Sequence, residues 1–356
     1  MKSAEKTGIR AFLLFFTLIC LVVSCRKTGV LQDSYYLSGS REDRENLREL
    51  FYLLNQEKSD AENEFAVTRE IAASYARLKD YGRLIHFLSE RMIRYPDDPY
   101  NSYYLLMIAY AYIQLDSEPI AARYFNLILK NYPDLTISDE SIHLMCLKQL
   151  IELNKDPQRQ VWYYQELISR FQDKIDPGIS YFMLGQACEQ TGDWNGAISA
   201  YSSYLPYTGT IINGFPNADH YAKQQVDFSR SPKDWTFESL DALRRTVETA
   251  LDTGNSRLLI RCQAKVNFFT RSWGQMETDD AGMADFNLSD FMQSDRIRYA
   301  ATLDASSNAT EAFLRTSGWS QNISIWYLYF RKIYFPQDPE IHGRWEWAGI
   351  YYGEKF

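Results

Sequence analysis

The chain has 356 residues, which is enough for two domains of ordinary size. Hydrophobic residues make up 46% of it and charged residues 24%, a composition typical of a folded protein that excludes a largely disordered one. The 38 basic and 46 acidic residues give a formal net charge of −8 at pH 7. Such a chain repels phosphate backbones, so we do not expect nucleic acid among its partners.

An apolar segment near the start of the chain predicts export. Lys2, Lys6 and Arg10 precede the apolar run AFLLFFTLICLVV at 11–23. A basic stretch followed by such a run is typical of a secretory signal peptide, and the run is too short to cross a bilayer comfortably as a helix. We therefore expect residues 1–24 to be a signal peptide.

The end of that segment resembles the lipobox of bacterial lipoproteins. It reads LVVSC at 21–25, with a small serine before the cysteine and Val22 where the family usually has leucine. The resemblance implies that Cys25 carries a lipid and that residues 25–42 tether the mature chain to a bacterial membrane. Arg26 after the cysteine favours the outer membrane, on its periplasmic or its surface face. The alternative is an ordinary secretory signal with an incidental cysteine.

The remaining cysteines lie too far apart in the sequence to form a known metal motif. We expect Cys146, Cys188 and Cys262 to be buried thiols. The four histidines are equally scattered, and the sequence has no P-loop, GxGxxG, HExxH or GxSxG motif. We therefore expect no metal, no cofactor and no enzymatic activity.

A short turn sequence recurs through the first part of the chain. Apolar residues at 44–56 follow the i, i+3, i+4, i+7 spacing of an amphipathic helix. Beyond it, one turn recurs at spacings of 37 and 39 residues, as RYPD at 94–97, NYPD at 131–134 and RFQD at 170–173. A period in this range is typical of stacked pairs of helices, and we expect Pro96 and Pro133 to end a helix in two of them.

The segments around these turns resemble the tetratricopeptide repeat (TPR), a pair of antiparallel helices called A and B. Four segments match it, at 65–98, 102–135, 141–174 and 178–211. Small residues stand where the two helices of a repeat approach closely, at Ala109, Ala121, Gly185 and Ala197. The resemblance implies a helical TPR domain at 43–212.

The third of these segments matches the family least well. Lys148 and Gln160 stand where small residues are expected, and Gln172 replaces the proline that usually ends the repeat. In the first segment Leu84 stands where alanine is expected, but the four segments are in near-register, so we still expect four repeats.

The resemblance also implies a binding groove, because helix A residues of this family line a concave surface that binds a protein or peptide. Carried over position by position, the groove residues are Arg69, Arg77, Leu106, Tyr110, Gln114, Gln149, Glu152, Phe182, Gln186 and Glu189. This groove would run from basic to acidic side chains, with Tyr110 and Phe182 as aromatic anchors. We expect Tyr110→Ala to abolish binding while stability stays near wild type.

A second domain is predicted after the repeats. Residues 213–235 are rich in Gly, Asn, Pro and Ser, which indicates a linker. The pattern then predicts helices at 237–252 and 256–269. Strand-like runs follow at 296–303, 312–316, 323–333 and 344–352. The expected fold is an α-helical TPR solenoid followed by an α+β domain at 236–356, with two helices and a mostly antiparallel, aromatic-rich sheet.

Aromatic residues are concentrated at the end of the chain, with eleven of them in 324–356. Neighbouring strand residues point to opposite faces, so both faces of the sheet are aromatic. One interpretation packs one face on the helices and the other on the repeats. The other is an aromatic recognition surface formed by Trp326, Tyr329, Trp345 and Trp347.

These patterns favour a lipid-anchored protein of the bacterial cell envelope that binds a protein or peptide partner. If the protein is a scaffold, the partner would be an envelope component. If it is an adhesin, the partner would be a host surface protein. The alternative is that the C-terminal domain binds a small ligand or performs catalysis while the repeats support it. Charged groups converging in a cavity would favour this alternative, and a filled aromatic core would not.

Overall fold

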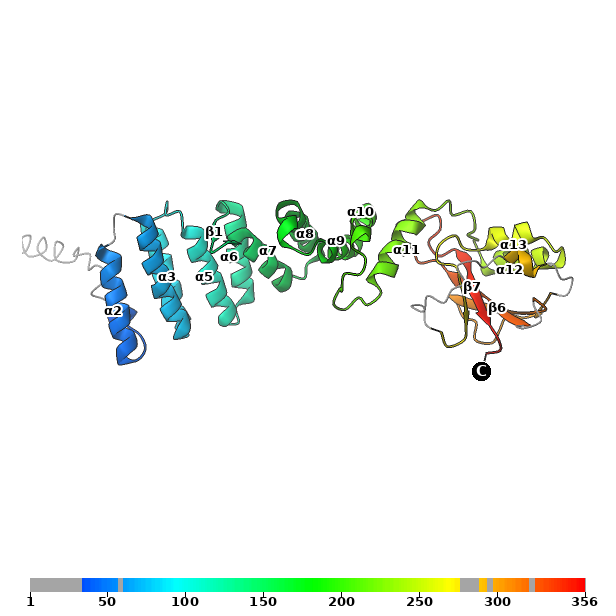
Figure 1. Ribbon diagram of the computed structural model, residues 1–356, viewed down its shortest axis with the longest axis horizontal. Helices are drawn as coiled ribbons and strands as arrows, with labels where there is room; N and C mark the ends of the chain where they lie inside the picture. Colours follow the sequence, from blue (N-terminus) through cyan, green and yellow to red (C-terminus); the bar gives the residue numbers. More distant parts are fainter. Residues whose placement is uncertain (1–33, 57–59, 276–287, 293–296, 320–323, 356) are drawn as a thin grey trace, which may run out of the picture. The chain divides into compact units, whose positions relative to one another are not determined.

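The computed structural model describes residues 34–56, 60–275, 288–292, 297–319 and 324–355 (Figure 1). The chain forms two compact units, Met1–Asn154 and Lys155–Phe356, which we call unit 1 and unit 2. The predicted signal peptide and Cys25 lie outside the described residues.

Unit 1 is helical, and its successive helices pack against each other. Its helices are α2 (Arg41–Gln56), α3 (Ala61–Arg77), α4 (Tyr81–Arg94), α5 (Asn101–Gln114), α6 (Glu118–Asn131) and α7 (Ile142–Leu153). A 3-10 turn, η2 (Ser34–Tyr36), precedes α2, and a short antiparallel pair, β1 (Thr136–Ile137) and β2 (Glu140–Ser141), joins α6 to α7. The predicted amphipathic helix at 44–56 is confirmed as part of α2.

The sequence sets the ends of these helices. The carboxylate of Asp60 accepts a hydrogen bond from a backbone N–H in the first turn of α3, and the hydroxyl of Ser141 does the same for α7. Helices α4 and α6 each end two residues before a proline, Pro96 and Pro133, as predicted. Capping residues and prolines therefore divide this part of the chain into short helices.

The segment before α2 is held against α4 by a buried tyrosine. Tyr36 is 3% exposed, and its hydroxyl donates to Glu90 at 2.7 Å and lies 2.7 Å from Nδ1 of His86. The hydroxyl of Tyr75 donates to the backbone oxygen of Tyr36 at 2.6 Å. The predicted tether at 25–42 is therefore too long, because the chain is already fixed at η2.

Unit 2 begins with further helices and ends in a sheet. The helices of its first part are α8 (Pro157–Phe171), α9 (Pro177–Thr191), α10 (Trp194–Tyr204) and α11 (Ala218–Arg230), with 3-10 turns η3 (Gln172–Lys174) and η4 (Leu205–Tyr207). Of the four predicted repeats, 65–98, 102–135 and 178–211 are each a pair of successive helices in contact. The boundary between the units falls inside 141–174, the segment that matched least well.

Small residues lie where helices meet, as predicted. Ala121 and Ala197 are 0% and 1% exposed. At Gly185 on α9, an added Cβ would come within 2.4 Å of the Tyr201 ring on α10. A larger residue at Gly185 would therefore force these two helices apart. This packing of helical hairpins is consistent with a solenoid.

The predicted linker at 213–235 is wrong over most of its length, because it contains helix α11. Ala218, Ala222 and Val226 are buried at i, i+4 and i+8 and pack against α9 and α10. The Gly, Asn and Pro residues that suggested a linker lie in the loop before the helix, apart from Pro232, which follows its end.

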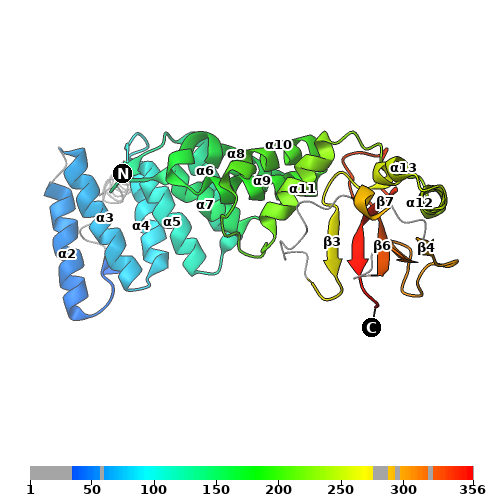
Figure 2. The same cartoon turned by 45° about the vertical axis from the view of Figure 1, so that its right-hand side comes forward.

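The rest of unit 2 is a mixed five-stranded sheet with helices packed on it (Figure 2). Its elements are α12 (Leu240–Asp252), α13 (Ser256–Cys262), β3 (Phe269–Ser272), α14 (Leu288–Phe291), β4 (Arg298–Tyr299), β5 (Glu311–Ser317), β6 (Ile325–Lys332) and β7 (Trp345–Tyr352). The strand order is β3-β7-β6-β5-β4, with β3 and β7 parallel and the other pairs antiparallel. The mostly antiparallel sheet is confirmed, but the second helix ends at Cys262 rather than 269.

The two faces of this sheet differ in what covers them. Leu243 and Val247 of α12 pack with Trp326, Trp345 and Trp347 in one core. The three tryptophans are 2%, 6% and 0% exposed, so they fill the space between helices and sheet. The interpretation that one face packs on the helices is confirmed, and its second part, that the other face packs on the repeats, stays a prediction.

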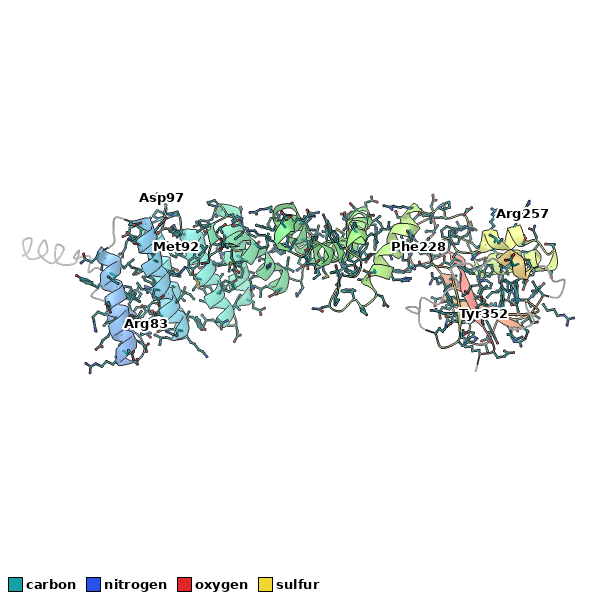
Figure 3. All side chains as sticks on the ribbon, viewed as in Figure 1. Arg83, Met92, Asp97, Phe228, Arg257 and Tyr352 are labelled. Carbon is teal, nitrogen blue, oxygen red and sulfur yellow. The ribbon has the colours of Figure 1, made fainter. Side chains whose placement is uncertain are left out.

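Helix α11 is joined to the sheet domain by a small core of its own. Phe228, labelled in Figure 3, packs against Phe335 with ring centroids 5.3 Å apart and against Trp235 at 6.4 Å. The side-chain nitrogen of Gln337 donates to Gln225 at 3.0 Å. Helix α11 thus contacts both the preceding helices and the sheet domain.

Candidate functional site

The ten predicted groove residues fall into two sets. Arg69, Arg77, Leu106, Tyr110, Gln114, Gln149 and Glu152 lie on α3, α5 and α7 of unit 1. Phe182, Gln186 and Glu189 lie on α9 of unit 2 and share one face of that helix. A groove continuous through all ten residues stays a prediction.

In unit 1 the predicted groove residues differ in how accessible they are. Arg69, Arg77, Gln114 and Glu152 are exposed. Leu106 is 2% exposed and so offers no surface to a partner, because its position on α5 faces the core. The set is therefore a polar surface with little apolar area to bury.

Tyr110 is half-buried and part of the packing of its own unit. Its ring meets Phe125 edge-to-face, with centroids 5.7 Å apart. Burial raises the pKa of Tyr110 above the ordinary value for tyrosine, and Cys146 contributes a smaller effect in the same direction. Its contact with Phe125 means that removing the ring affects stability as well as any binding.

In unit 2 the structure brings two predicted groove residues into a pocket of about 270 Å³. Phe182 and Gln186 of α9 form one side, and Tyr221 of α11 forms another. The loop residues Gly214, Phe215, Pro216, Asn217 and Ala218 complete the lining. The lining is mostly apolar and aromatic, with the amide of Gln186 as a polar group, a composition typical of a small binding site.

The loop that closes this pocket is fixed at both ends. Ile212 is 5% exposed and anchors it in the core of α9, α10 and α11. The carboxylate of Asp219 accepts a hydrogen bond from the hydroxyl of Tyr204 and another from the backbone N–H of Gly209 at 2.9 Å. Gly214 adopts φ +82°, a conformation that glycine reaches without strain. The wall formed by the loop is therefore preformed.

A hydrogen-bonded group of side chains lies behind Tyr221. The Tyr221 hydroxyl donates to the carboxylate of Glu189, 2.9 Å from each oxygen. The side-chain nitrogen of Gln186 donates to the Tyr201 hydroxyl at 2.7 Å, and Tyr201 also hydrogen bonds to Glu189. Burial raises the pKa of Glu189 above its ordinary value, because it outweighs the lowering by the two tyrosines. These contacts fix the orientation of Gln186 and Tyr221 in the pocket.

Phe182 supports the pocket rather than presenting itself to a partner. It is 0% exposed and packs against Tyr204 and Phe215, with ring centroids 5.4 and 5.2 Å apart. Phe215 is 36% exposed. Ile211, in the same loop, is 85% exposed, and Ile179, in the first turn of α9, is 39% exposed. The accessible apolar groups of this region therefore come from the loop and from the start of α9.

The predicted aromatic surface of the sheet is not one surface. Trp326, Trp345 and Trp347 face the helices, whereas Tyr329 lies on the opposite face, where it packs against Phe313 at 5.2 Å. The Tyr329 hydroxyl donates to Glu311 at 2.6 Å, and the ring is 8% exposed. None of the four residues offers a large accessible area.

Sequence reasoning missed Tyr221 and Phe215, because both lie in the predicted linker. The signal that could have found them is the i, i+4, i+8 spacing of Ala218, Ala222 and Val226, directly after Pro216. That spacing indicates a helix with one buried face, which makes Tyr221 a candidate for a pocket wall.

Cysteine and metal chemistry add nothing to this site. Cys146, Cys188 and Cys262 are free and buried, as predicted, and burial raises the pKa of Cys188 and of Cys262 to about 11. Within the described residues, no three histidine, cysteine or acidic side chains are grouped as metal ligands would be.

None of the helices in the described part of the chain is long and apolar enough to span a membrane.

Comparison with known proteins assigns no family to the chain. No model of a known protein family matches it, and no curated protein matches it either.

Proposed function

We propose that this chain is a TPR-type lipoprotein of the bacterial cell envelope that binds a protein or peptide partner. The observation that carries the proposal is the preformed pocket beside α9, which contains Gln186 and Tyr221 and lies next to Glu189. Two of the predicted groove residues line it and a third is hydrogen bonded to its wall. A partner would insert a side chain into this pocket and contact the exposed helix surfaces around it.

The helix packing supports the TPR assignment. Ala109, Ala121, Gly185 and Ala197 are buried at helix contacts, which are the positions where the family requires small residues. Helix α11 follows the last repeat and covers it, as a terminal helix does in a solenoid. The fit is weakest at 141–174, where the sequence also departs most from the pattern.

A filled core favours this function over a ligand site or an enzyme in the sheet domain. Trp326, Trp345 and Trp347 occupy the space between helices and sheet. The buried carboxylate of Glu346 is neutralised by Arg331 at 2.7 Å and accepts from the Trp235 indole at 3.1 Å. These are the contacts of a packed interior, and the charges in it are paired rather than directed at a cavity.

Reversible cross-linking in cells tests the binding function. Asn217 is exposed, lines the pocket and makes no side-chain cap to α11, so Asn217→Trp fills the pocket at little cost to folding. The control is Asn195→Trp, the same change at an exposed position of α10 outside the pocket. Loss of the cross-linked partner in the first variant alone supports the proposal. Equal capture by both variants contradicts it.

The lipid anchor has its own test. If Cys25 is the lipidated residue, Cys25→Ala leaves an unprocessed precursor that takes up no labelled fatty acid. Processing and detergent partitioning identical to wild type would show that the signal is an ordinary secretory one. Protease treatment of intact cells then separates a scaffold facing the periplasm from an adhesin at the surface.

A further inference from the structure

Resting on the proposed function, we infer that the partner residue bound in the pocket beside α9 is a cation, a lysine or arginine side chain. Its aliphatic stem would lie between Phe215 and Tyr221, and its charged end would lie against the ring of Tyr221, with the carboxylate of Glu189 behind that residue. The inference goes beyond the proposed function because it states the chemistry of the partner.

The aromatic walls carry the first part of the argument. Phe182 is central to a group of rings, with its centroid 5.2 Å from Phe215 and 6.5 Å from Tyr221. Tyr221 in turn meets Tyr201 edge-to-face at 5.7 Å. Aromatic faces attract cations as well as apolar groups, and a lysine or arginine side chain presents both.

The carboxylate of Glu189 carries the second part. Its hydrogen bonds come from the hydroxyls of Tyr221 and Tyr201, which are neutral donors. Two such donors leave acceptor capacity on a carboxylate, which offers about four lone-pair sites. No lysine or arginine among the described residues forms an ion pair with Glu189, so its charge is balanced only by neutral groups. A half-buried carboxylate of this kind is stabilised by a cation brought from outside.

The charges around the pocket carry the third part. Helix α9 (Pro177–Thr191) contains no lysine or arginine, and neither does the segment 208–221 that forms the opposite wall. Glu189 and Asp219 are the acidic residues of these two stretches. The nearest cation further along α11, Lys223, is engaged by Asp227. A cationic side chain therefore meets no lysine or arginine from these two stretches, whereas an acidic one would be repelled by their carboxylates.

The experiment compares probes that differ only in charge. N-acetyl-lysine amide and N-acetyl-arginine amide are titrated into the purified protein, with N-acetyl-norleucine amide as the neutral analogue that keeps the stem. Binding is followed by NMR of aromatic ring protons. We expect at least one cationic probe to bind about tenfold more tightly than norleucine, an advantage that falls as salt is raised.

Two variants sharpen the result. Glu189→Gln keeps an acceptor for the Tyr221 hydroxyl and removes the charge, so the ratio of cationic-probe affinity to norleucine affinity should fall to about one. Asn217→Trp should abolish binding of all probes, and circular dichroism checks that both variants are folded.

Two outcomes would overturn the inference, and they differ from failure of the proposed function. Norleucine binding as tightly as lysine and arginine would mean that the pocket takes an apolar side chain. Absence of binding by every probe would mean that the pocket does not bind a lysine or arginine side chain. In both cases the proposed function still stands if Asn217→Trp abolishes partner capture in cells, and it fails if capture is unaffected.

Discussion

Unit 2 contains two aromatic-rich regions that use similar residues with opposite results. In the sheet domain, Trp326, Trp345 and Trp347 are covered by α12 and α13 and are at most 6% exposed. In the pocket beside α9, Phe215 stays 36% exposed because only a fixed loop holds it in place. The comparison shows that a high density of aromatic residues does not mark a recognition surface. Aromatic rings are available to a partner only where no other helix or strand covers them.

The largest effect is expected from breaking the covered region. Trp347 is 0% exposed, and its indole N–H donates to the backbone oxygen of Gly349 at 2.9 Å. Trp347→Ala should reduce the free energy of unfolding by about 3–5 kcal/mol, because it leaves a cavity and removes the hydrogen bond of the indole. Urea denaturation measures it, with Tyr334→Ala at a 77% exposed position as the control. A loss of stability for Trp347→Ala as small as that for Tyr334→Ala would mean that Trp347 is not a core residue.

A medium effect is expected at the helix contact that supports the pocket. In Gly185→Val the new side chain would overlap the Tyr201 ring, so we expect a loss of about 1–3 kcal/mol. Gly82→Ala on α4 is the control, because no atom lies within 4 Å of the added Cβ there and alanine favours a helix. Thermal melting should fall for the first variant and stay level or rise for the second. An unchanged melting temperature for Gly185→Val would contradict the close packing of α9 on α10.

A smaller loss of stability is expected for Tyr110→Ala in unit 1, although the sequence alone predicts that this change leaves stability near wild type. Because its ring packs on Phe125, Tyr110→Ala should lower stability by about 1 kcal/mol. Tyr110→Phe keeps that contact and serves as the control. A Tyr110→Ala variant as stable as wild type would restore the sequence-based view that the ring is free for a partner.

The smallest effect concerns the pH dependence of stability at Glu189. Its pKa is raised in the folded protein, so the folded state holds more protons than the unfolded state as pH falls from neutral toward the ordinary pKa of glutamate. Stability from this group therefore increases as pH falls through that window and levels off below it. Glu189→Gln should remove this part of the pH dependence in denaturant titrations at several pH values. An identical pH dependence in both proteins would show that burial does not penalise the charge.

The sequence predicted the helical hairpins well, because their signals are local. Turn spacing and prolines such as Pro96 act on neighbouring residues, so the ends of helices such as α4 follow from them. Four of the five strands coincide with predicted runs, since β6 and β7 are rich in aromatic residues, but β3 was missed because the second helix was predicted to extend to residue 269.

What the sequence did not predict depends on which elements meet. Alternation in β6 separates Trp326 from Tyr327, but it does not say which face α12 covers. The pocket depends on a helix that composition alone marks as a linker, and Tyr221 reaches Glu189 across 32 residues. Long-range pairing of this kind has no local signal.

The burial of Tyr36 limits how far the helices of unit 1 can lie from an anchor at Cys25. If Cys25 carries the lipid, the chain between the membrane and the first fixed turn at Ser34 spans nine residues, or about 30 Å when fully extended. The hydrogen bonds of Tyr36 to Glu90 and from Tyr75 place the attachment point on the side of the first helical pair rather than at the end of a long flexible arm. If unit 1 also binds a partner as proposed, that partner would meet its first helices close to the lipid surface. Force applied through the anchor would act on the contacts of Tyr35 with Arg83 and then on those of Tyr36.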